Sequence, residues 1–230
     1  IDAYEINGQE KRIADVKFTK NGIRFDLSPY TIRSFAVKLK GTDMTAISQQ
    51  PVEIPYNADA ISFDENREDG IMFNGRSLPA ELLPDFIESE GIRFKIGSKE
   101  DEQNNAVVCG GQTIPLPDGS YTKLYLLAAA ANDTRADFYV DGQPTALGIQ
   151  RWTGYVGQFY NRILSPDQDK VVEMKEPYAK TDNIAWFASH CHNNYPMKNQ
   201  AYQYCYLYKY VIPIPAGAKN ITLPNNRGIK

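Results

Sequence analysis

The sequence offers few side chains for metal or thiol chemistry. It contains two histidines and three cysteines, Cys109, Cys191 and Cys205, which form no C-x-x-C pair. An odd number of cysteines leaves at least one thiol unpaired, and this spacing indicates neither a disulfide scaffold nor a zinc ribbon. We therefore expect the three cysteines to be small apolar residues buried in a core.

Long apolar runs and an excess of one charge are also absent. No stretch approaches the roughly 18 apolar residues that a membrane span requires, and the longest, residues 124–131, suits a buried strand. The 25 basic and 28 acidic residues give a formal net charge of -3 and are spread along the chain. These features predict a protein that binds neither nucleic acid nor a membrane.

The chain does contain a succession of strand-sized apolar segments separated by Gly, Pro, Asn and Asp. They are residues 91–97, 105–116, 123–131, 136–143, 145–152, 184–190, 201–215 and 220–224. No alternation of strands with helices appears among them. The pattern predicts an all-β fold, an antiparallel β-sandwich or jelly roll of the galactose-binding-like type.

Changes in this pattern divide the chain into three parts. We expect residues 1–40 to form the closing strands of a preceding β-sandwich domain, with a two-residue hairpin at Asn21 and Gly22. Residues 41–90 have a weaker pattern with scattered prolines, which favours a linker leading into a second domain and one short helix within 78–87. Residues 91–230 then form a jelly-roll-like β-sandwich module.

Tyrosines occupy every second position from Tyr202 to Tyr210. This alternation predicts a strand that carries all five rings on the same face. Such a stripe can pack against the rest of a sheet, or it can line a surface with its hydroxyls in water.

Both histidines lie in the segment ASHCHNNYP, residues 188–196. His190 and His192 are two positions apart, so on a strand their imidazoles project from one face and could share a metal ion. The nearest further ligands in the sequence are Asp182, Asn193 and Asn194. The spacing is permissive rather than specific, and we favour imidazoles that bond to the backbone or line a polar groove. We therefore assign no metal ligand in this chain.

The aromatic residues favour a carbohydrate-binding groove. Trp152 and Trp186 stand beside polar residues, and an exposed tryptophan ring can stack on the apolar face of a sugar. The alternative is that both tryptophans belong to the core. The candidate carbohydrate-binding residues are Trp152, Trp186, His190, His192, Asn194 and Tyr195.

No catalytic residue is assigned. A glycosidase needs two carboxylates held roughly 5 to 10 Å apart, and no acidic residues in the sequence mark such a pair. The acidic segment at residues 62–70 is typical of a solvated loop. The sequence also lacks the Gly-x-Ser-x-Gly motif of a serine nucleophile.

Two motifs near the start of the chain carry a family resemblance. The pattern E-x-N-G-x-E is matched by Glu5, Asn7, Gly8 and Glu10, and the pattern L-x-P-Y-x-I-R-x-F by Leu27, Pro29, Tyr30, Ile32, Arg33 and Phe35. This segment resembles the closing strands of the C-terminal β domain of bacterial α-mannosidases of glycoside hydrolase family 38. The chain from residue 110 onward is similar to the extra C-terminal β-sandwich found on some bacterial members.

The resemblance implies a chain without catalytic machinery of its own. The family's zinc ion, its His and Asp ligands and its aspartate nucleophile belong to an N-terminal α/β domain that has no counterpart in this sequence. We therefore expect a C-terminal fragment of a larger periplasmic or secreted enzyme, with no cofactor in this chain and zinc in the absent catalytic domain.

The leading hypothesis is a non-catalytic accessory module of a glycoside hydrolase of the α-mannosidase type. Its partners would be a mannoside or related glycan and the preceding catalytic domain of the same polypeptide. One alternative is a purely structural β-sandwich domain with no glycan site. A second alternative is a stand-alone metal-dependent hydrolase that uses His190 and His192.

Overall fold

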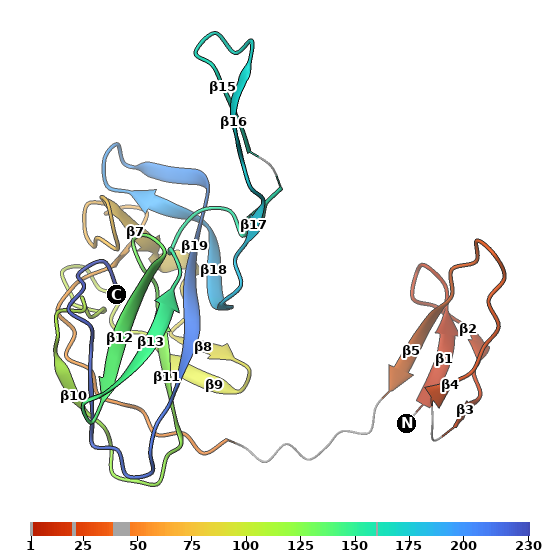
Figure 1. The fold of residues 1–230 in the computed structure, drawn as a ribbon, viewed down its shortest axis with the longest axis horizontal. Helices are drawn as coiled ribbons and strands as arrows, with labels where there is room; N and C mark the ends of the chain where they lie inside the picture. Colours follow the sequence, from red (N-terminus) through yellow and green to blue (C-terminus); the bar gives the residue numbers. More distant parts are fainter. Residues whose placement is uncertain (1, 20–21, 39–46, 160) are drawn as a thin grey trace. The chain divides into compact units, whose positions relative to one another are not determined.

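The chain forms two compact units. The computed structural model describes residues 2–19, 22–38, 47–159 and 161–230, and its contacts divide the chain into residues 1–46 and residues 47–230. Both units are built from β-strands, as Figure 1 shows. Among the described residues, no helix is long and apolar enough to cross a membrane.

The first unit contains a small antiparallel sheet and a separate hairpin. Its strands are β1 (Asp2–Ile6), β2 (Arg12–Asp15), β3 (Phe18–Thr19), β4 (Gly22–Ile23) and β5 (Ser34–Lys38). β1 lies between β2 and β5, and β3 pairs with β4. Of the predicted Asn-Gly turn, Gly22 is the first residue of β4 and pairs with Thr19, whereas Asn21 lies outside the described part of the chain.

A bidentate ion pair links the two motifs of the first unit. Arg33 donates from Nε to Oε1 of Glu5 at 2.8 Å and from Nη2 to Oε2 at 2.5 Å. Two parallel charge-assisted hydrogen bonds fix both side chains in one geometry. The same contact lowers the pKa of the Glu5 carboxyl.

The second unit consists of two β-sheets that share one hydrophobic core. Their strands are β6 (Ile61–Ser62), β7 (Arg76–Pro79), β10 (Thr113–Pro115), β11 (Lys123–Ala128), β12 (Thr134–Val140), β13 (Gln143–Ile149), β18 (Asn183–Asn193), β19 (Lys198–Pro213) and β20 (Asn220–Thr222). One sheet has the order β10-β20-β12-β13 and the other the order β11-β19-β18-β7-β6. Buried residues of both sheets, such as Phe138 and Ile212, belong to the same cluster. The expected all-β sandwich is confirmed.

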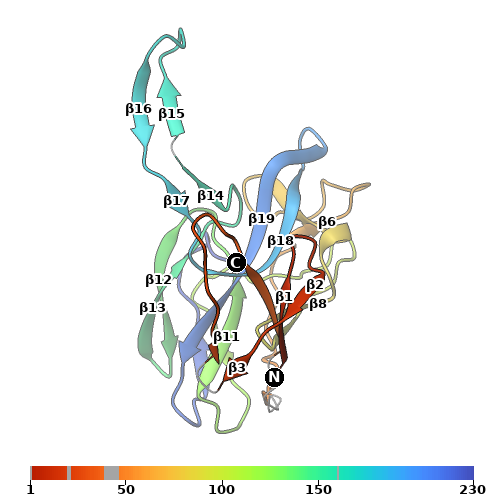
Figure 2. The ribbon, with the colours of Figure 1, turned by 90° about the vertical axis from the view of Figure 1, so that its right-hand side faces the viewer.

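Three hairpin-like pairs and one short helical turn complete this unit. They are β8 (Phe86–Ser89) with β9 (Ile92–Lys95), β14 (Gly157–Gln158) with β17 (Tyr178–Ala179), β15 (Asn161–Leu164) with β16 (Val171–Lys175), and the 3-10 turn η1 (Ala80–Leu82). Figure 2 shows the β15–β16 hairpin extending away from the two sheets. Every strand segment predicted from residue 91 onward contains an observed strand.

The segment that we expected to be a linker belongs to the second unit from residue 47 onward. β6 and β7 are part of the five-stranded sheet, and Ala60, Ile61 and Leu78 are buried in the core. Strands of two and four residues are too short to show alternation, so their pairing is fixed by the neighbouring strand rather than by a local pattern. The short helix expected within 78–87 is reduced to the three residues of η1.

Three tyrosines of the predicted stripe pack inside the second unit, Tyr204 is half-buried, and the side chain of Tyr202 lies outside the described part of the chain. On β19, Tyr206, Tyr208 and Tyr210 are buried, and successive ring centroids are 5.9 and 6.3 Å apart. The Tyr206 hydroxyl donates a hydrogen bond to the Gly154 carbonyl at 2.8 Å, and the Tyr208 hydroxyl donates to the Arg151 carbonyl at 3.0 Å. The Tyr210 hydroxyl donates to Oδ2 of Asp182 at 2.8 Å. Tyr206 and Tyr208 therefore hold the segment after β13 against the sheet, and Tyr210 holds the residue before β18.

The three cysteines are buried and form no disulfide, as expected. Burial raises the pKa of each thiol, that of Cys109 to about 12. Uncharged buried thiols act as small apolar side chains and not as nucleophiles or metal ligands.

Candidate functional site

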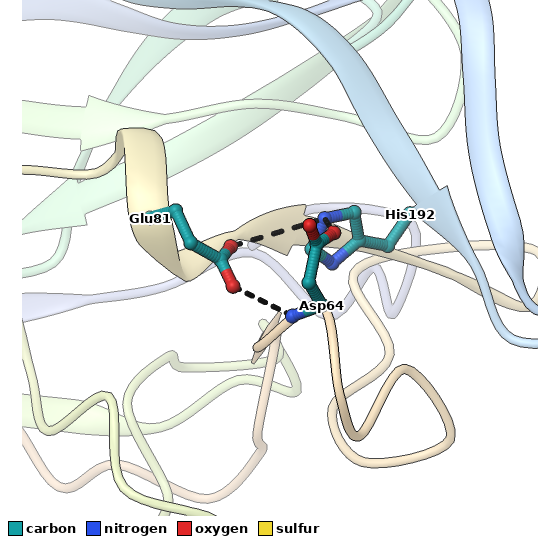
Figure 3. Close-up of side chains that lie close together, drawn as sticks. All are labelled: Asp64, Glu81 and His192. Carbon is teal, nitrogen blue, oxygen red and sulfur yellow. Dashed lines mark hydrogen bonds and ion pairs between the residues drawn. The ribbon is translucent and has the colours of Figure 1, made fainter.

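Two carboxylates and one histidine converge at one end of the five-stranded sheet. β6 and β7 are parallel neighbours, so the segments that follow them leave the sheet at the same end. Asp64 follows β6 and Glu81 lies in η1, directly after β7. His192 on β18 pairs with Ser77 on β7. Figure 3 shows the three side chains, Asp64, Glu81 and His192, pointing toward one another.

The polar atoms of this cluster lie at the distances of a small-ion site. Nε2 of His192 is 3.0 Å from Oδ1 of Asp64 and 3.9 Å from Oε2 of Glu81. One atom from each side chain lies within 4.8 Å of the other two. The other oxygen of Glu81, Oε1, accepts a hydrogen bond from the Asp64 backbone N–H at 2.6 Å, which fixes the two acidic segments relative to each other.

A buried pair of serines holds the other side of the imidazole. Nδ1 of His192 is 3.0 Å from Oγ of Ser62, which is 2.5 Å from Oγ of Ser77. All three side chains are fully buried, whereas the side chains of Asp64 and Glu81 are 53% and 38% exposed. His192 therefore forms the buried side of the cluster, and the two carboxylates form its solvent-exposed side.

Nε2 of His192 lacks a hydrogen bond although it is buried. The nearest oxygen, on Asp64, is close enough but does not meet the geometry of a hydrogen bond, and no other described residue supplies a partner. Burial, with the nearby positive charge of Arg67, lowers the pKa of His192. The lowered pKa favours the neutral imidazole at neutral pH. A buried nitrogen without a hydrogen-bond partner is rare in folded proteins and is a candidate position for a ligand.

Arg67 forms an ion pair with one of the two carboxylates of the cluster. Its Nη2 donates to Oδ1 of Asp64 at 2.5 Å and lowers the pKa of that carboxyl. Asp64 is thus ionised throughout the physiological range. Glu81 is the second carboxylate of the cluster, so two acidic side chains lie beside one guanidinium and one imidazole.

Comparison with known proteins identifies the family of the second unit. Residues 48–230 match the family model described as the AziU2-like beta-sandwich domain. The chain belongs to this family. A search of curated proteins found no match. The AziU2-like domain contains Asp64, Glu81 and His192, whereas the two motifs that resemble α-mannosidases lie before it in the sequence.

The structure brings some of the predicted site residues of the AziU2-like domain to this cluster. The ring of His190 lies 5.7 Å from that of His192, centroid to centroid, and its Nδ1 is 3.1 Å from Oγ of Ser189. Trp186 donates from Nε1 to the Leu82 carbonyl in η1 at 3.1 Å, beside Glu81. The two imidazoles do share a side of the strand, as expected, but the carboxylates lie next to His192.

Other predicted residues lie elsewhere or have different roles. Trp152 is 1% exposed and packs against Phe73, so its burial leaves no face for a sugar. Asn194 donates to the carbonyls of Asp69 and Gly70, each at 3.3 Å, and so anchors the loop that follows Asp64. Tyr195 is 91% exposed in the turn after β18.

Asp64, Glu81, Ser62 and Ser77 were not predicted as site residues. Ser62 and His192 are 130 positions apart, and Ser62 and Ser77 are 15 apart. Only the pairing of β6, β7 and β18 brings these positions together, and neither β6 nor β7 has a readable strand pattern. Asp182, a ligand considered from the sequence, instead accepts the hydrogen bond of Tyr210.

Proposed function

We propose that the chain is a non-catalytic accessory region of a glycoside hydrolase of the α-mannosidase type, and that its AziU2-like domain binds a glycan. The observation that carries the accessory role is the apolar surface of the first unit. Leu27, Tyr30 and Ile32 belong to the motif that resembles α-mannosidases, and all three side chains are exposed. In the described part of residues 1–46, Ala3 alone is a buried hydrophobic residue.

A unit that buries so little apolar surface needs a partner surface to be stable. Ile13, Phe25 and Val37 of this unit are exposed as well, and many exposed apolar side chains on one small unit are typical of a contact with another domain. The resemblance supplies a partner of the right kind, because the matching strands of the α-mannosidases close a β domain of the enzyme. The accessory role follows if the first unit completes such a domain.

The polar end of the AziU2-like domain supports the glycan-binding part of the proposal. Asp64 and Glu81 offer exposed carboxylates, and His190 offers a partly buried imidazole. Such groups bond to sugar hydroxyls. Tyr195 adds an exposed aromatic ring two residues after β18, and an aromatic face can stack on a pyranose.

Calorimetric titration of the 1–230 chain with α-mannosides and mannan tests glycan binding. We expect saturable binding that is weakened in Asp64→Asn and in Tyr195→Ala. Tyr139→Ala is the matched control, since Tyr139 is an exposed tyrosine on β12 of the other sheet. Absence of binding to every glycan tested would reject a glycan site and favour the purely structural alternative.

Hydrolysis of an aryl mannoside tests the non-catalytic assignment separately. We expect no turnover by the 1–230 chain, with or without added zinc. Zinc-dependent turnover that disappears in His192→Ala would overturn the assignment and favour the stand-alone metal-dependent hydrolase.

A further inference from the structure

The geometry points to a binding site for one divalent transition-metal ion, with Zn²⁺ as the reference ion, held by Asp64, Glu81 and His192 of the AziU2-like domain. This inference goes beyond glycan binding, because it depends on the three side chains alone. The three side chains that would bind the ion are those drawn in Figure 3.

The spacing of His192 and Asp64 matches that of two ligands of a single ion. Zinc binds nitrogen and carboxylate oxygen at about 2.0–2.2 Å, so two ligands of one ion lie roughly 2.9–3.5 Å apart. The 3.0 Å between Nε2 of His192 and Oδ1 of Asp64 falls in this range. The 3.9 Å between Nε2 of His192 and Oε2 of Glu81 is longer than this range, so Oε2 would have to move toward the ion while Oε1 keeps its hydrogen bond to the Asp64 backbone N–H.

The contact between His192 and Asp64 is better explained by a shared ion than by a hydrogen bond. The two atoms approach closely without hydrogen-bond geometry, and Nε2 has no other partner among the described residues. Two ligands that direct their lone pairs at the same ion approach each other in this way. Nε2 of the fully buried His192 therefore points into the cluster without a hydrogen-bond partner, and a bound metal ion would provide one for its lone pair.

The surroundings of His192 prepare it as a ligand. A metal-binding histidine is neutral and donates its second N–H to a neighbouring group, which fixes the ring and its tautomer. Nδ1 of His192 can donate to Ser62, whose hydroxyl can then donate to Ser77. This arrangement leaves the lone pair on Nε2, the atom that faces the carboxylates.

The ligand set selects the class of ion. One imidazole nitrogen and two carboxylate oxygens suit Zn²⁺ and its first-row neighbours, whereas Ca²⁺ and Mg²⁺ favour oxygen ligands alone. The positive charge of Arg67 repels a cation, but Arg67 also fixes the Asp64 carboxylate by an ion pair. The site has two carboxylates against one guanidinium, which favours binding of a cation. Three protein ligands leave a coordination position for water on the exposed side.

Titration of Zn²⁺ into the chelator-treated 1–230 chain, in the absence of glycan, tests the site. We expect one ion per chain by calorimetry and by metal analysis after dialysis. Glu81→Gln and Asp64→Asn should each weaken binding roughly 100-fold, and Ser62→Ala about 10-fold. Both carboxylates are exposed, so these two variants are expected to fold even if His192→Ala does not.

Controls separate this site from other ligands. Glu88→Gln removes an exposed carboxylate on β8 outside the cluster and should leave Zn²⁺ affinity unchanged. His190→Ala should retain binding within a few-fold, and loss of binding in this variant would refute the ligand set. Bound Co²⁺ should show the visible spectrum of nitrogen and oxygen ligation without a thiolate charge-transfer band.

The inference is rejected if the 1–230 chain takes up less than stoichiometric Zn²⁺, or if Glu81→Gln and Asp64→Asn bind it as tightly as the unaltered chain. Glycan binding in chelator-treated protein would show that the two proposals are independent. Zn²⁺ binding without any glycan binding would support the metal site and reject only the glycan proposal.

Discussion

The imidazole of His192 is fully buried, with Oγ of Ser62 beside Nδ1 and Oδ1 of Asp64 beside Nε2. Burial is the main reason that its pKa is lowered from the ordinary value of 6.5. The groups around it are Asp64 and Glu81, which favour the charged form, and Arg67 and His190, which oppose it. Burial and the two opposing groups outweigh the carboxylates, so folding favours the neutral ring.

This balance predicts a loss of stability in mild acid. Below pH 6.5 the unfolded chain binds a proton at position 192 that the folded chain does not, so the free energy of unfolding falls as the pH decreases. The slope from this one group is at most about 1.4 kcal/mol for each pH unit. It ends once the pH falls below the lowered folded-state pKa of His192.

Urea denaturation of chelator-treated protein between pH 7 and pH 5 measures this slope. The glutamates with lowered pKa values, Glu5 and Glu90, titrate below this window, since their ordinary value is 4.5. His192→Gln should flatten the dependence, and His190→Gln serves as the comparison. An unchanged slope in His192→Gln would show that the ring is not held neutral by folding.

At the scale of single elements, β19 supports its neighbours through tyrosine hydroxyls as well as ring area. Tyr208 is fully buried and donates to the Arg151 carbonyl, which also accepts a hydrogen bond from Nζ of Lys180 at 2.9 Å. Tyr208→Phe keeps the ring and removes one buried hydrogen bond. We expect a loss of about 1 kcal/mol in the free energy of unfolding, measured by denaturant titration.

The exposed Tyr139 on β12 is the control for this change, and Tyr139→Phe should alter stability little. Equal effects at both positions would mean that the hydroxyl of Tyr208 contributes nothing specific. A much larger loss at Tyr208 would indicate that the segment after β13 detaches from the sheet.

The short turn η1 links Trp186 to the proposed metal site. Trp186 donates to the Leu82 carbonyl, and Glu81 is the preceding residue in the turn. Trp186→Phe removes this hydrogen bond while keeping an aromatic ring, so Glu81 is less firmly placed. We expect Zn²⁺ affinity to fall about 10-fold by calorimetry, as for other groups that orient a ligand.

Phe187→Leu is the matched variant on the same strand, because the side chain of Phe187 is 62% exposed. It should bind Zn²⁺ as the unaltered chain does. If both variants lose affinity equally, the effect belongs to β18 as a whole, and the hydrogen bond to η1 would have no special role.

Strand length explains which elements could be predicted from the sequence. β11, β12 and β13 have six or seven residues and β19 has sixteen, which is long enough for an apolar run, as in β11, or an alternation, as in β19, to be recognised. β6 has two residues and β7 has four, and their partners lie far away in the sequence. The predicted strand 184–190 therefore ends two residues before His192, which β18 includes, and Asp64, which does lie in an exposed turn, was given no role in a site.

On the scale of the whole molecule, the two units differ in how much apolar surface they bury. The main hydrophobic cluster draws only on residues of the second unit, from Val52 to Ile229. The described residues of the first unit expose Leu27, Tyr30 and Ile32. A chain of 184 residues is long enough to form a stable core, whereas one of 46 residues is marginal.

These differences predict that residues 47–230 fold without the first unit. The fragment is expected to melt cooperatively at nearly the same temperature as the main transition of the 1–230 chain, because no residue of its core is removed. Differential scanning calorimetry of both proteins measures this. A melting temperature lower by more than about 5 °C, roughly 1 kcal/mol or more for a domain of this size, would show that the first unit stabilises the AziU2-like domain. The apolar residues of the first unit would then have a partner within this chain, and the case for an accessory contact with another domain would be lost.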